Sequence, residues 1–389
     1  MTTSTPPAPP VVRRSPRGLL ASLTSLTSLT SLAALATLAV AAACDTAPRL
    51  PTPDYAVIDS LFSAFSAEGR PGASVVVVRN GEVVLDTAYG LSDVELGIPA
   101  SRGTHYRLAS LSKQFTATAV LLLVKDGALQ LDSSARGILP ELPAYASGVT
   151  VRHLLTHTSG LWDYEDFVPD TQTYQVKDGD ALSLVAQRAE SLYFAPGAAW
   201  RYSNTGYALL ALIVERVSGQ RFPAFLRERV LTPLGMRSTV AHEEGKDTIP
   251  HRAWGYTLRG DTVVRTDQSS TSAVLGDGGI YSSIEELVKW DSALTRRTLL
   301  GDSLWRDATT PAVLTSGAAT SYGFGWFVDS YRGRARLHHH GESRGFTNAI
   351  SRYPDDGLTI IVLTNRTGSA PWDIVDRLSD LYLGAAMSE

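Results

Sequence analysis

Ser110 and Lys113 lie three residues apart in the stretch RLASLSKQFTATAVLLLV, residues 107–124. On a helix, residues i and i+3 share a face, so the hydroxyl and the amine are expected to be neighbours. A serine hydroxyl is a poor nucleophile unless a base takes its proton, and a lysine can be that base only where desolvation or nearby charge lowers its pKa. The apolar run 115–124 would help to provide such surroundings. The pair predicts nucleophilic catalysis; the alternative is a serine near a helix start and a lysine whose stem covers apolar surface.

Tyr202 and Asn204 stand in a predicted turn before an amphipathic helix, in FAPGAAWRYSNTGYALLALIVERVSG, residues 194–219. A tyrosine beside a lysine ammonium can lose its phenolic proton and act as a general base, and an asparagine amide can orient both lysine and substrate. A packed tyrosine and a helix-capping asparagine are the structural alternative.

The segment ARLHHHGESRGF, residues 335–346, supplies the third group of residues. Side chains alternate along a strand, so His339 and Gly341 share one face while His338 and His340 share the other. A strand edge with a histidine and a bare glycine backbone lets a substrate lie against the sheet. The backbone amides of Glu342 and Ser110 would then be available to a developing oxyanion.

The elements that must position these groups follow from the hydrophobic pattern. Two β-branched runs meet at Asn80-Gly81, which is a strong hairpin signal. Helices are expected over 55–68, 115–125, 182–191, 207–218, 285–293 and 371–383, and strands over 322–329, 335–341, 346–353 and 358–365. This order predicts a three-layer α+β fold: an antiparallel β-sheet completed by both ends of the domain and flanked by helices, with an inserted all-helical lobe. The cleft between sheet and lobe is the expected site.

Composition indicates an ordinary globular body. The 389 residues are 44% hydrophobic and 19% charged, with a formal charge of -4, which argues against a fibre or a disordered chain. The arginines are scattered and form no basic face, so we expect no nucleic-acid partner. We predict one hydrolase domain over 55–385, without a cofactor.

Residues 1–44 differ from the rest and predict an export signal. Three arginines (13, 14 and 17) precede an uncharged segment, and the only cysteine, Cys44, follows three alanines. Cys44 resembles the lipid-modified cysteine of bacterial lipoproteins, although Ala41 stands where that signal usually carries leucine. Cleavage at the alanines and an uncleaved anchor are the alternatives, and all three place the body outside the cytoplasm. Residues 45–54 form a proline-rich linker.

Taken together, these motifs resemble the serine β-lactamase and penicillin-binding-protein superfamily. The resemblance is closest to the branch shared by class C β-lactamases, DD-peptidases and family VIII esterases, and it runs from about 55 to 383. The motifs that carry it, in the family's order, are SLSK (110–113), THTSGL (156–161), FAPGAAWRYSN (194–204), PLGMRST (233–239), GGIYSSIEELVKW (278–290), YGFGW (322–326) and HHGESRGF (339–346).

The resemblance implies the two-lobed fold and a covalent mechanism. Ser110 would be the nucleophile and Lys113 its proton acceptor. Tyr202 would be an acid/base that also works in deacylation, and Asn204 the orienting amide. The backbone N–H groups of Ser110 and Glu342 would form the oxyanion hole. The substrate would be a small molecule or a peptidoglycan-like peptide, with an ester, amide or β-lactam carbonyl.

Two positions depart from the family pattern in ways that affect the substrate. His339 would stand where many relatives carry a lysine, and a histidine that is mostly neutral near pH 7 holds a substrate carboxylate less firmly. Glu342 adds an acid beside it. Both favour a neutral ester or an amide over a β-lactam, although Arg344 would compensate if it points inward. Trp326 is a further candidate for lining an acyl pocket, with a packing role as its alternative.

Three other functions are possible. Residues 341–345 also fit the GxSxG elbow of α/β-hydrolases, with Ser343 as nucleophile, but that motif needs a helix after it and a histidine later in the chain. A metal site at His338 and His340 lacks accompanying ligands of zinc spacing. A receptor that becomes acylated and then signals or holds its ligand would keep Ser110 and Lys113. We expect a hydrolase.

Overall fold

The computed structural model of the protein describes residues 54–384, which belong to one compact unit, Thr52–Glu389. The predicted export signal, Cys44 and all but the last residue of the linker lie outside the described residues, so these remain predictions. Within residues 54–384, no helix is both long and apolar enough to cross a membrane.

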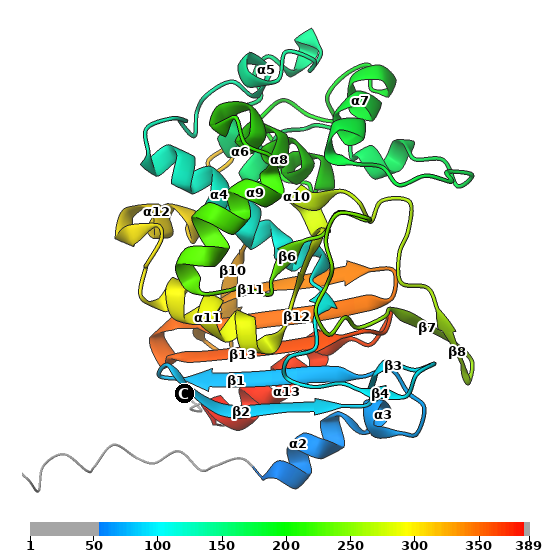
Figure 1. Cartoon of the computed structure of the whole chain (residues 1–389). Coiled ribbons are helices and arrows are strands. Elements are labelled where there is room, and N and C mark those ends of the chain that lie inside the picture. Colours follow the sequence, from blue (N-terminus) through cyan, green and yellow to red (C-terminus); the bar gives the residue numbers. More distant parts are fainter. Residues whose placement is uncertain (1–53, 385–389) are drawn as a thin grey trace, which may run out of the picture. The chain divides into compact units, whose positions relative to one another are not determined.

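A six-stranded antiparallel sheet has the order β10-β11-β12-β13-β1-β2 (Figure 1). Its strands are β1 (Ala73–Arg79), β2 (Glu82–Tyr89), β10 (Phe327–Tyr331), β11 (Arg334–Ser343), β12 (Phe346–Tyr353) and β13 (Leu358–Thr364). The first two strands meet at Asn80-Gly81, where both residues have positive φ, as a type I′ hairpin turn requires. β1 pairs with β13 in the register Val76↔Ile361, so strands from both ends of the domain complete one sheet.

Apolar residues alternate between the two faces of the central strands. In β1, Val75 and Val77 pack into one core and Val76 and Val78 into another, which explains why the whole strand is apolar. The first core is covered by α2 (Tyr55–Leu61), α3 (Ser63–Ser66) and α13 (Pro371–Leu383). The second faces α11 (Ile284–Thr295) and the helical lobe, giving the three layers seen in Figure 1. The predicted α+β fold is confirmed.

The lobe is inserted between the two halves of the sheet. Its helices and their neighbours are α4 (Lys113–Lys125), α5 (Ala135–Ile138), α6 (Val151–Leu155), α7 (Asp178–Arg188), α8 (Asn204–Ser218), α9 (Phe222–Leu226), α10 (Leu275–Gly278) and α12 (Gly301–Ala308). Short strands form three small sheets: β3 (Leu91–Asp93) with β4 (Ile98–Pro99); β5 (Tyr106–Arg107), β9 (Ile280–Ser282) and β6 (Val240–Ala241); and β7 (Tyr256–Arg259) with β8 (Thr262–Arg265). Single turns are η1 (Ala109–Ser112), η2 (Ala144–Ala146), η3 (Tyr164–Phe167), η4 (Arg227–Leu231), η5 (Thr232–Leu234) and η6 (Pro354–Asp356).

Three predicted elements differ clearly from the structure. The helix expected over 182–191 is α7, Asp178–Arg188. The helix expected over 55–68 is broken at Phe62 into α2 and α3. The strand expected over 322–329 begins only at Phe327. A Cβ on Gly323 would lie 2.2 Å from the carbonyl oxygen of Ala308, and Gly325 has φ +79°, so this stretch is a tightly packed loop rather than extended backbone.

Candidate active site

Ser110 lies on a single 3₁₀ turn, η1, immediately before α4. The approach to the turn is held in place because β5 pairs with β9 and the Leu108 amide donates to the carbonyl of Ile280 at 2.8 Å. Ala109 has φ +51°, a left-handed conformation that is rare outside glycine and typical of functional sites. The turn leaves Ser110 half-buried on the wall of a cleft.

Lys113 is the first residue of α4 and is fully buried. Its Nζ lies 3.1 Å from Ser110 Oγ, 2.8 Å from Asn204 Oδ1 and 3.0 Å from the carbonyl oxygen of Asp277. The amide and carbonyl oxygens can only accept, so they take two N–H groups of the amine. A neutral lysine has two N–H groups and one lone pair, and here that lone pair would face the Ser110 hydroxyl. The arrangement therefore suits Lys113 for taking the serine proton.

Asn204 reaches Lys113 because it begins α8. Its backbone N–H donates to Asp163 Oδ2 at 2.6 Å, and Asp163 Oδ1 accepts the N–H of Glu165 at 3.1 Å, which caps η3. Burial raises the pKa of Asp163 above its ordinary value. One carboxyl group thus ties the start of α8 to η3.

His157 positions the loop that carries Tyr202. Its Nδ1 accepts the N–H of Ser203 at 3.2 Å, and its carbonyl accepts the N–H of Arg201 at 3.0 Å. Burial, followed by the charge of Lys113 and the nearby His339, lowers the pKa of His157 well below its ordinary value, so the ring is neutral and can accept. These two hydrogen bonds allow His157 to fix the loop that carries Tyr202.

Tyr202 lies against the same amine. Lys113 Nζ is 4.9 Å from the centroid of the Tyr202 ring, within range of a cation–π contact. The phenolic oxygen is buried and has no hydrogen-bond partner among the described residues, including Ser110 and Lys113. The structure places Tyr202 beside Lys113 but shows no hydrogen bond from its hydroxyl, so its part in proton transfer stays a prediction.

His339 does not line the cleft. It is 1% exposed, its Nδ1 lies 2.7 Å from the carbonyl oxygen of His340, and its Nε2 lies 2.9 Å from Tyr322 Oη. Because a carbonyl only accepts, Nδ1 carries the proton and Nε2 accepts from the tyrosine. Burial, followed by the charge of Lys113, lowers the pKa of His339 well below its ordinary value. A neutral ring with both nitrogens bonded inside the protein offers nothing to a substrate carboxylate, in contrast to the role that the resemblance implied.

Gly341 allows β11 to approach the nucleophile turn. A Cβ at this position would lie 2.2 Å from the carbonyl oxygen of Leu108, so any side chain would push the strand and η1 apart. β10 pairs with β11 only as far as Phe327↔His338, so within residues 54–384 the following residues of β11 have no strand partner on that side. Glu342 and Ser110 both line the cleft, the placement that a shared oxyanion hole requires.

The cleft has a volume of about 260 Å³. It is lined by Arg107, Ala109, Ser110, Tyr164, Glu165, Asn204, Ser269, Thr271, Ser272, Asp277, Gly278, Glu342, Ser343 and Arg344. Four predicted site residues are in this set: Ser110, Asn204, Glu342 and Arg344. Polar side chains from η1, η3, α8, α10 and the end of β11 therefore converge around the serine, as expected of a small-molecule site.

Several cleft residues were not predicted from the sequence, among them Tyr164, Glu165 and Asp277. Tyr164 donates its hydroxyl to Asp277 Oδ2 at 2.8 Å. Burial, opposed by Lys113 and assisted by Glu165 and Asp178, raises the pKa of Asp277 to about 8, so its carboxyl is mostly protonated at neutral pH. Burial also raises the pKa of Glu165. Asp277 stands next to the GGIYSSIEELVKW motif, and that proximity is the only signal that could have indicated it.

The remaining candidates lie elsewhere. Trp326 is 2% exposed and packs edge-on against Trp305 at 6.3 Å between ring centroids, so it does not line the cleft. His338 lies 3.3 Å from Asp329, and among residues 54–384 no three metal-ligating side chains gather. Ser343 ends β11 and is followed by the strand β12, not by the helix that a GxSxG elbow needs.

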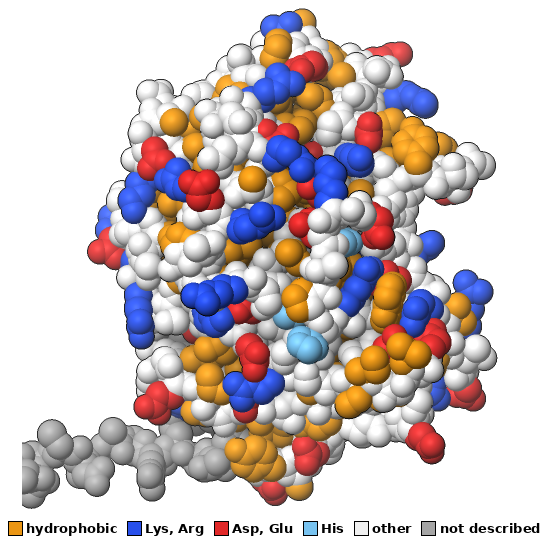
Figure 2. Space-filling view, in the orientation of Figure 1, with side chains coloured by type: hydrophobic (Ala, Val, Ile, Leu, Met, Phe, Trp, Pro, Cys, Tyr) orange, Lys and Arg blue, Asp and Glu red, His pale blue; other side chains and the backbone are white. Residues whose placement is uncertain are grey.

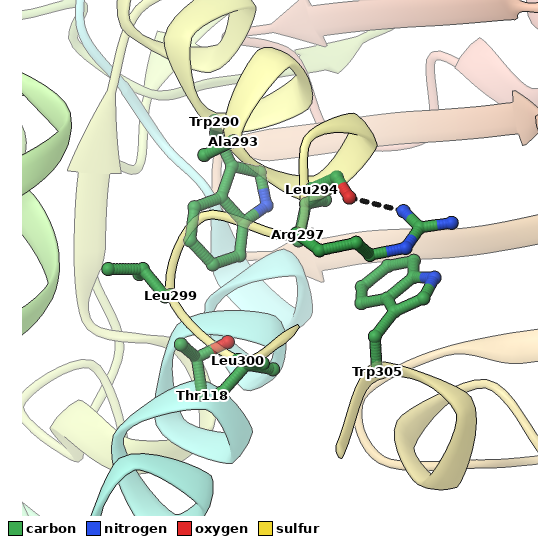
Figure 3. Close-up of a pocket in the computed structure, with 8 residues that line it drawn as sticks. All are labelled: Thr118, Trp290, Ala293, Leu294, Arg297, Leu299, Leu300 and Trp305. Atoms are coloured by element: carbon green, nitrogen blue, oxygen red, sulfur yellow. Dashed lines mark hydrogen bonds between the residues drawn. The ribbon is translucent and has the colours of Figure 1, made fainter. Parts of the chain in front are cut away.

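A second pocket is too small to be the site. It lies between α4, α11 and α12 and is lined mainly by apolar side chains, among them Trp290, Leu294 and Trp305, with the Arg297 guanidinium donating to the Leu294 carbonyl (Figure 3). Its volume of about 10 Å³ is at the lower limit for a single water molecule.

Comparison with known proteins agrees with this geometry. Residues 58–384 match the family described as Beta-lactamase. Penicillin-binding protein 4* of Bacillus subtilis is 30% identical over 323 residues, which cover 79% of this chain and 71% of that protein. A D-aminopeptidase of Gluconobacter oxydans is 27% identical over 77% of this chain, but the match spans only 57% of the relative's length.

Solved structures show the same fold. The octameric penicillin-binding protein homologue from Pyrococcus abyssi superposes with a TM-score of 0.74 at 26% identity, over 85% of this chain and 78% of that one. D-amino acid amidase from Ochrobactrum anthropi gives 0.72 at 26% identity, over 84% and 97%. The chain thus belongs to the beta-lactamase family and is a serine hydrolase.

Proposed function

We propose that this hydrolase acts through an acyl-enzyme on Ser110 and that its substrates are amides or esters of small D-amino-acid compounds. The observation that carries the proposal is the hydrogen-bond set of Lys113, in which two obligate acceptors leave Ser110 as the only possible donor to the amine. Ser110 Oγ would attack the carbonyl carbon as its proton passes to Lys113. The amides of Ser110 and Glu342 would hold the oxyanion, and Tyr202 would help to protonate the leaving group and to activate water.

The substrate class is supported by the relatives and by the charges of the cleft. Relatives named for D-aminopeptidase and D-amino acid amidase activity share the fold and more than a quarter of the aligned residues. The cleft carries acidic as well as basic side chains, including Glu165, so it suits a substrate with an amine better than a purely anionic one. The neutral, internally bonded His339 also disfavours a β-lactam held by its carboxylate.

Turnover of D-alanine p-nitroanilide and p-nitrophenyl acetate by residues 45–389 tests the proposal. Ser110→Ala is expected to abolish both activities, because among the described residues that line the cleft only the Ser110 hydroxyl is hydrogen-bonded to an amine. Ser343→Ala, which removes another serine hydroxyl of the same cleft, is expected to retain them. Turnover that survives in Ser110→Ala would contradict the assignment.

The intact mass after exposure to benzylpenicillin separates the hydrolase from the receptor alternative. A stable adduct on Ser110 without turnover of either chromogenic substrate would favour a penicillin-acylated receptor, which the similarity to a penicillin-binding protein makes worth testing. An adduct that forms and then decays would favour a hydrolase that tolerates β-lactams.

We also propose that the protein is exported and anchored through a lipid on Cys44. The order of arginines, apolar segment, alanines and cysteine in residues 13–44 supports this. Expression with labelled palmitate in a bacterial host should label the wild-type protein but not Cys44→Ser. Label in the variant, or none in either protein, would contradict lipidation.

A further inference from the structure

One of the two acceptors that hold Lys113 lies on a very short helix. The Asp277 carbonyl, which accepts from the Lys113 amine at 3.0 Å, belongs to α10, a helix of four residues. The first four N–H groups of a helix have no partner within it, so a helix of this length is held mainly by other elements. The position of the carbonyl, and with it the orientation of the amine, therefore depends on what holds α10.

Asp178 holds the start of α10 from another helix. It is the first residue of α7. Its Oδ2 accepts the N–H of Leu275 at 3.0 Å, and its Oδ1 accepts the N–H of Gly276 at 2.9 Å. The residue before α10, Val274, makes no side-chain cap of its own. Asp178 thus satisfies two N–H groups that the start of a helix leaves free.

The other contacts of α10 connect it to the catalytic pair. A Cβ on Gly276 would lie 2.2 Å from the Tyr207 carbonyl oxygen of α8, and the Gly276 carbonyl accepts the Thr116 hydroxyl of α4 at 2.7 Å. A Cβ on Gly278 would lie 3.6 Å from Ala109, beside the nucleophile. Because α10 packs against α8, α4 and η1 (Figure 1), a shift of α10 would reach both the amine and the nucleophile turn.

The environment of Asp178 is unusual for an acidic side chain. Figure 2 shows acidic side chains exposed over one face of the molecule, which is their common position, whereas Asp178 is only 9% exposed. Burial, opposed by the two backbone hydrogen bonds and assisted by Glu215 of α8, raises the pKa of Asp178 to about 7. Asp277 of α10 is mostly protonated at neutral pH, and Glu165 and Asp166 of η3 are exposed. Asp178 therefore changes its charge near neutral pH.

The charge of Asp178 determines how firmly it can hold α10. An ionised carboxylate accepts with both oxygens, and its charge-assisted hydrogen bonds are about twice as strong as neutral ones. In a protonated carboxyl one oxygen becomes a hydroxyl, which accepts more weakly. The bonds to Leu275 and Gly276 should therefore strengthen as the pH rises through about 7.

We propose that Asp178 is a positioning residue for the reaction: it holds α10 so that the Asp277 carbonyl orients Lys113 toward the nucleophile, and it does so most firmly when it is ionised. Asp163 has the same relation to the other acceptor of the amine, since it bonds the N–H of Asn204 at 2.6 Å. The inference rests on the proposed function, because its effect is on the acylation of the serine.

The pH dependence of acylation tests the proposal. In stopped-flow kinetics with p-nitrophenyl acetate, Asp178→Asn should acylate about tenfold or more slowly than wild type at pH 8.5, because a small misplacement of a catalytic group lowers the rate strongly. At pH 6, where wild-type Asp178 is protonated, the difference should be at least about threefold smaller. Asp180→Asn, an exposed acid on the same helix, should keep the wild-type profile.

Two results of this experiment would overturn the proposal. A ratio of wild-type to Asp178→Asn rates that is constant with pH would show a merely structural role. Acylation faster than wild type at pH 6 would show that Asp178 acts through its charge on the amine, because removing a nearby negative charge lowers the pKa of a lysine. The burst amplitude gives the fraction of active protein and corrects each rate for misfolded molecules.

Hydrogen exchange separates this inference from the proposed function, because it needs no turnover. At pH 8, the amides of residues 275–278 should exchange about tenfold or more rapidly in Asp178→Asn than in wild type, and at the wild-type rate in Asp180→Asn. If acylation survives in Ser110→Ala, the proposed function fails while exchange still tests the hold on α10. Wild-type exchange in Asp178→Asn would overturn the role of Asp178.

Thr116→Val provides a second test if Asp178→Asn does not fold. Valine has a similar shape but lacks the hydroxyl that donates to the Gly276 carbonyl, so it loosens α10 from α4. Acylation should fall about threefold or more at every pH from 6 to 8.5, since the lost hydroxyl does not titrate in this range. Acylation at the wild-type rate would show that the hold on α10 does not affect the reaction and would overturn the proposal.

Discussion

At the scale of single residues, the site depends on hydrogen-bond donors and acceptors more than on formal charge. Lys113 meets two atoms that can only accept and one hydroxyl that can accept or donate, so an amine in its neutral form would have only the Ser110 hydroxyl from which to take a proton. Tyr202 differs, because its buried hydroxyl has no partner among residues 54–384. An unpaired buried polar group is costly to stability and is often retained for function.

This contrast predicts that Tyr202→Phe lowers activity without lowering stability. Removing an unpaired buried hydroxyl should leave the free energy of unfolding unchanged or raise it by up to about 1–3 kcal/mol. Turnover should fall at least about a hundredfold if the hydroxyl transfers protons. Urea denaturation and p-nitrophenyl acetate kinetics on the same preparation measure both effects. A loss of stability above about 1 kcal/mol, or unchanged turnover, would contradict this account.

At the scale of elements, the site is made by close approach between β11 and the turn η1. Gly341 lacks the Cβ that would collide with the Leu108 carbonyl oxygen at 2.2 Å. The same contact brings the end of β11 near Ser110, where the two backbone amides are expected to hold an oxyanion. The distance between a strand and a single turn is therefore part of the chemistry.

Gly341→Ala is expected to reduce the acylation rate strongly, because the added methyl carbon would lie 2.2 Å from the Leu108 carbonyl oxygen and the strand or the turn must shift to admit it. Gly179→Ala is the control, since Gly179 lies in α7 with no heavy atom within 4 Å of the added Cβ. Alanine there should be neutral or stabilise the helix by up to about 1 kcal/mol. Stopped-flow kinetics with p-nitrophenyl acetate would measure acylation. Rates for Gly341→Ala within threefold of wild type would show that the close contact is dispensable.

Elements with a strong period could be predicted from the sequence, but the cleft lining could not. The last helix, 371–383, and the strand 346–353 have the predicted bounds because their apolar patterns are long and regular. The sequence predicts a strand over the loop 322–326, because the alternation of apolar residues does not show that a glycine is tightly packed. Glu165 and Asp277 reach the cleft through the tertiary packing of the short elements η3 and α10. The spacing of residues in the sequence does not predict such packing.

At the scale of the whole molecule, the interior holds titratable groups that respond to pH in opposite directions. Burial raises the pKa of Asp178 to about 7 and that of Asp277 to about 8. Burial lowers the pKa of His338 to about 4 and the pKa values of His157 and His339 well below their ordinary value. All five groups are therefore neutral in the folded protein near pH 6.5, the aspartates by keeping a proton and the histidines by lacking one.

The free energy of unfolding should therefore be greatest near about pH 6.5. Below that pH the three histidines bind protons in the unfolded chain but stay neutral in the folded protein. Their effect outweighs the opposite effect of the two aspartates, so the free energy of unfolding falls as pH falls. From about pH 4 upward the folded chain keeps protons that unfolded aspartates release, so their stabilisation is lost as pH rises through about 7 and 8. Each such group contributes at most about 1.4 kcal/mol per pH unit. Above about pH 6.5 only the aspartate effect remains among these five groups, and stability should decline.

Asp277→Asn isolates one of these groups. The amide keeps an oxygen for the Tyr164 hydroxyl but cannot ionise, so the decline between about pH 6.5 and 8 should become shallower, by at most about 1.4 kcal/mol per pH unit. Asp302→Asn, at an exposed position on α12, should keep the wild-type slope. Urea denaturation at half-unit intervals from pH 5 to 8.5 would measure the slopes. Equal slopes in Asp277→Asn and wild type would mean that Asp277 is already ionised in the folded protein, which would contradict a buried neutral carboxyl beside Tyr164.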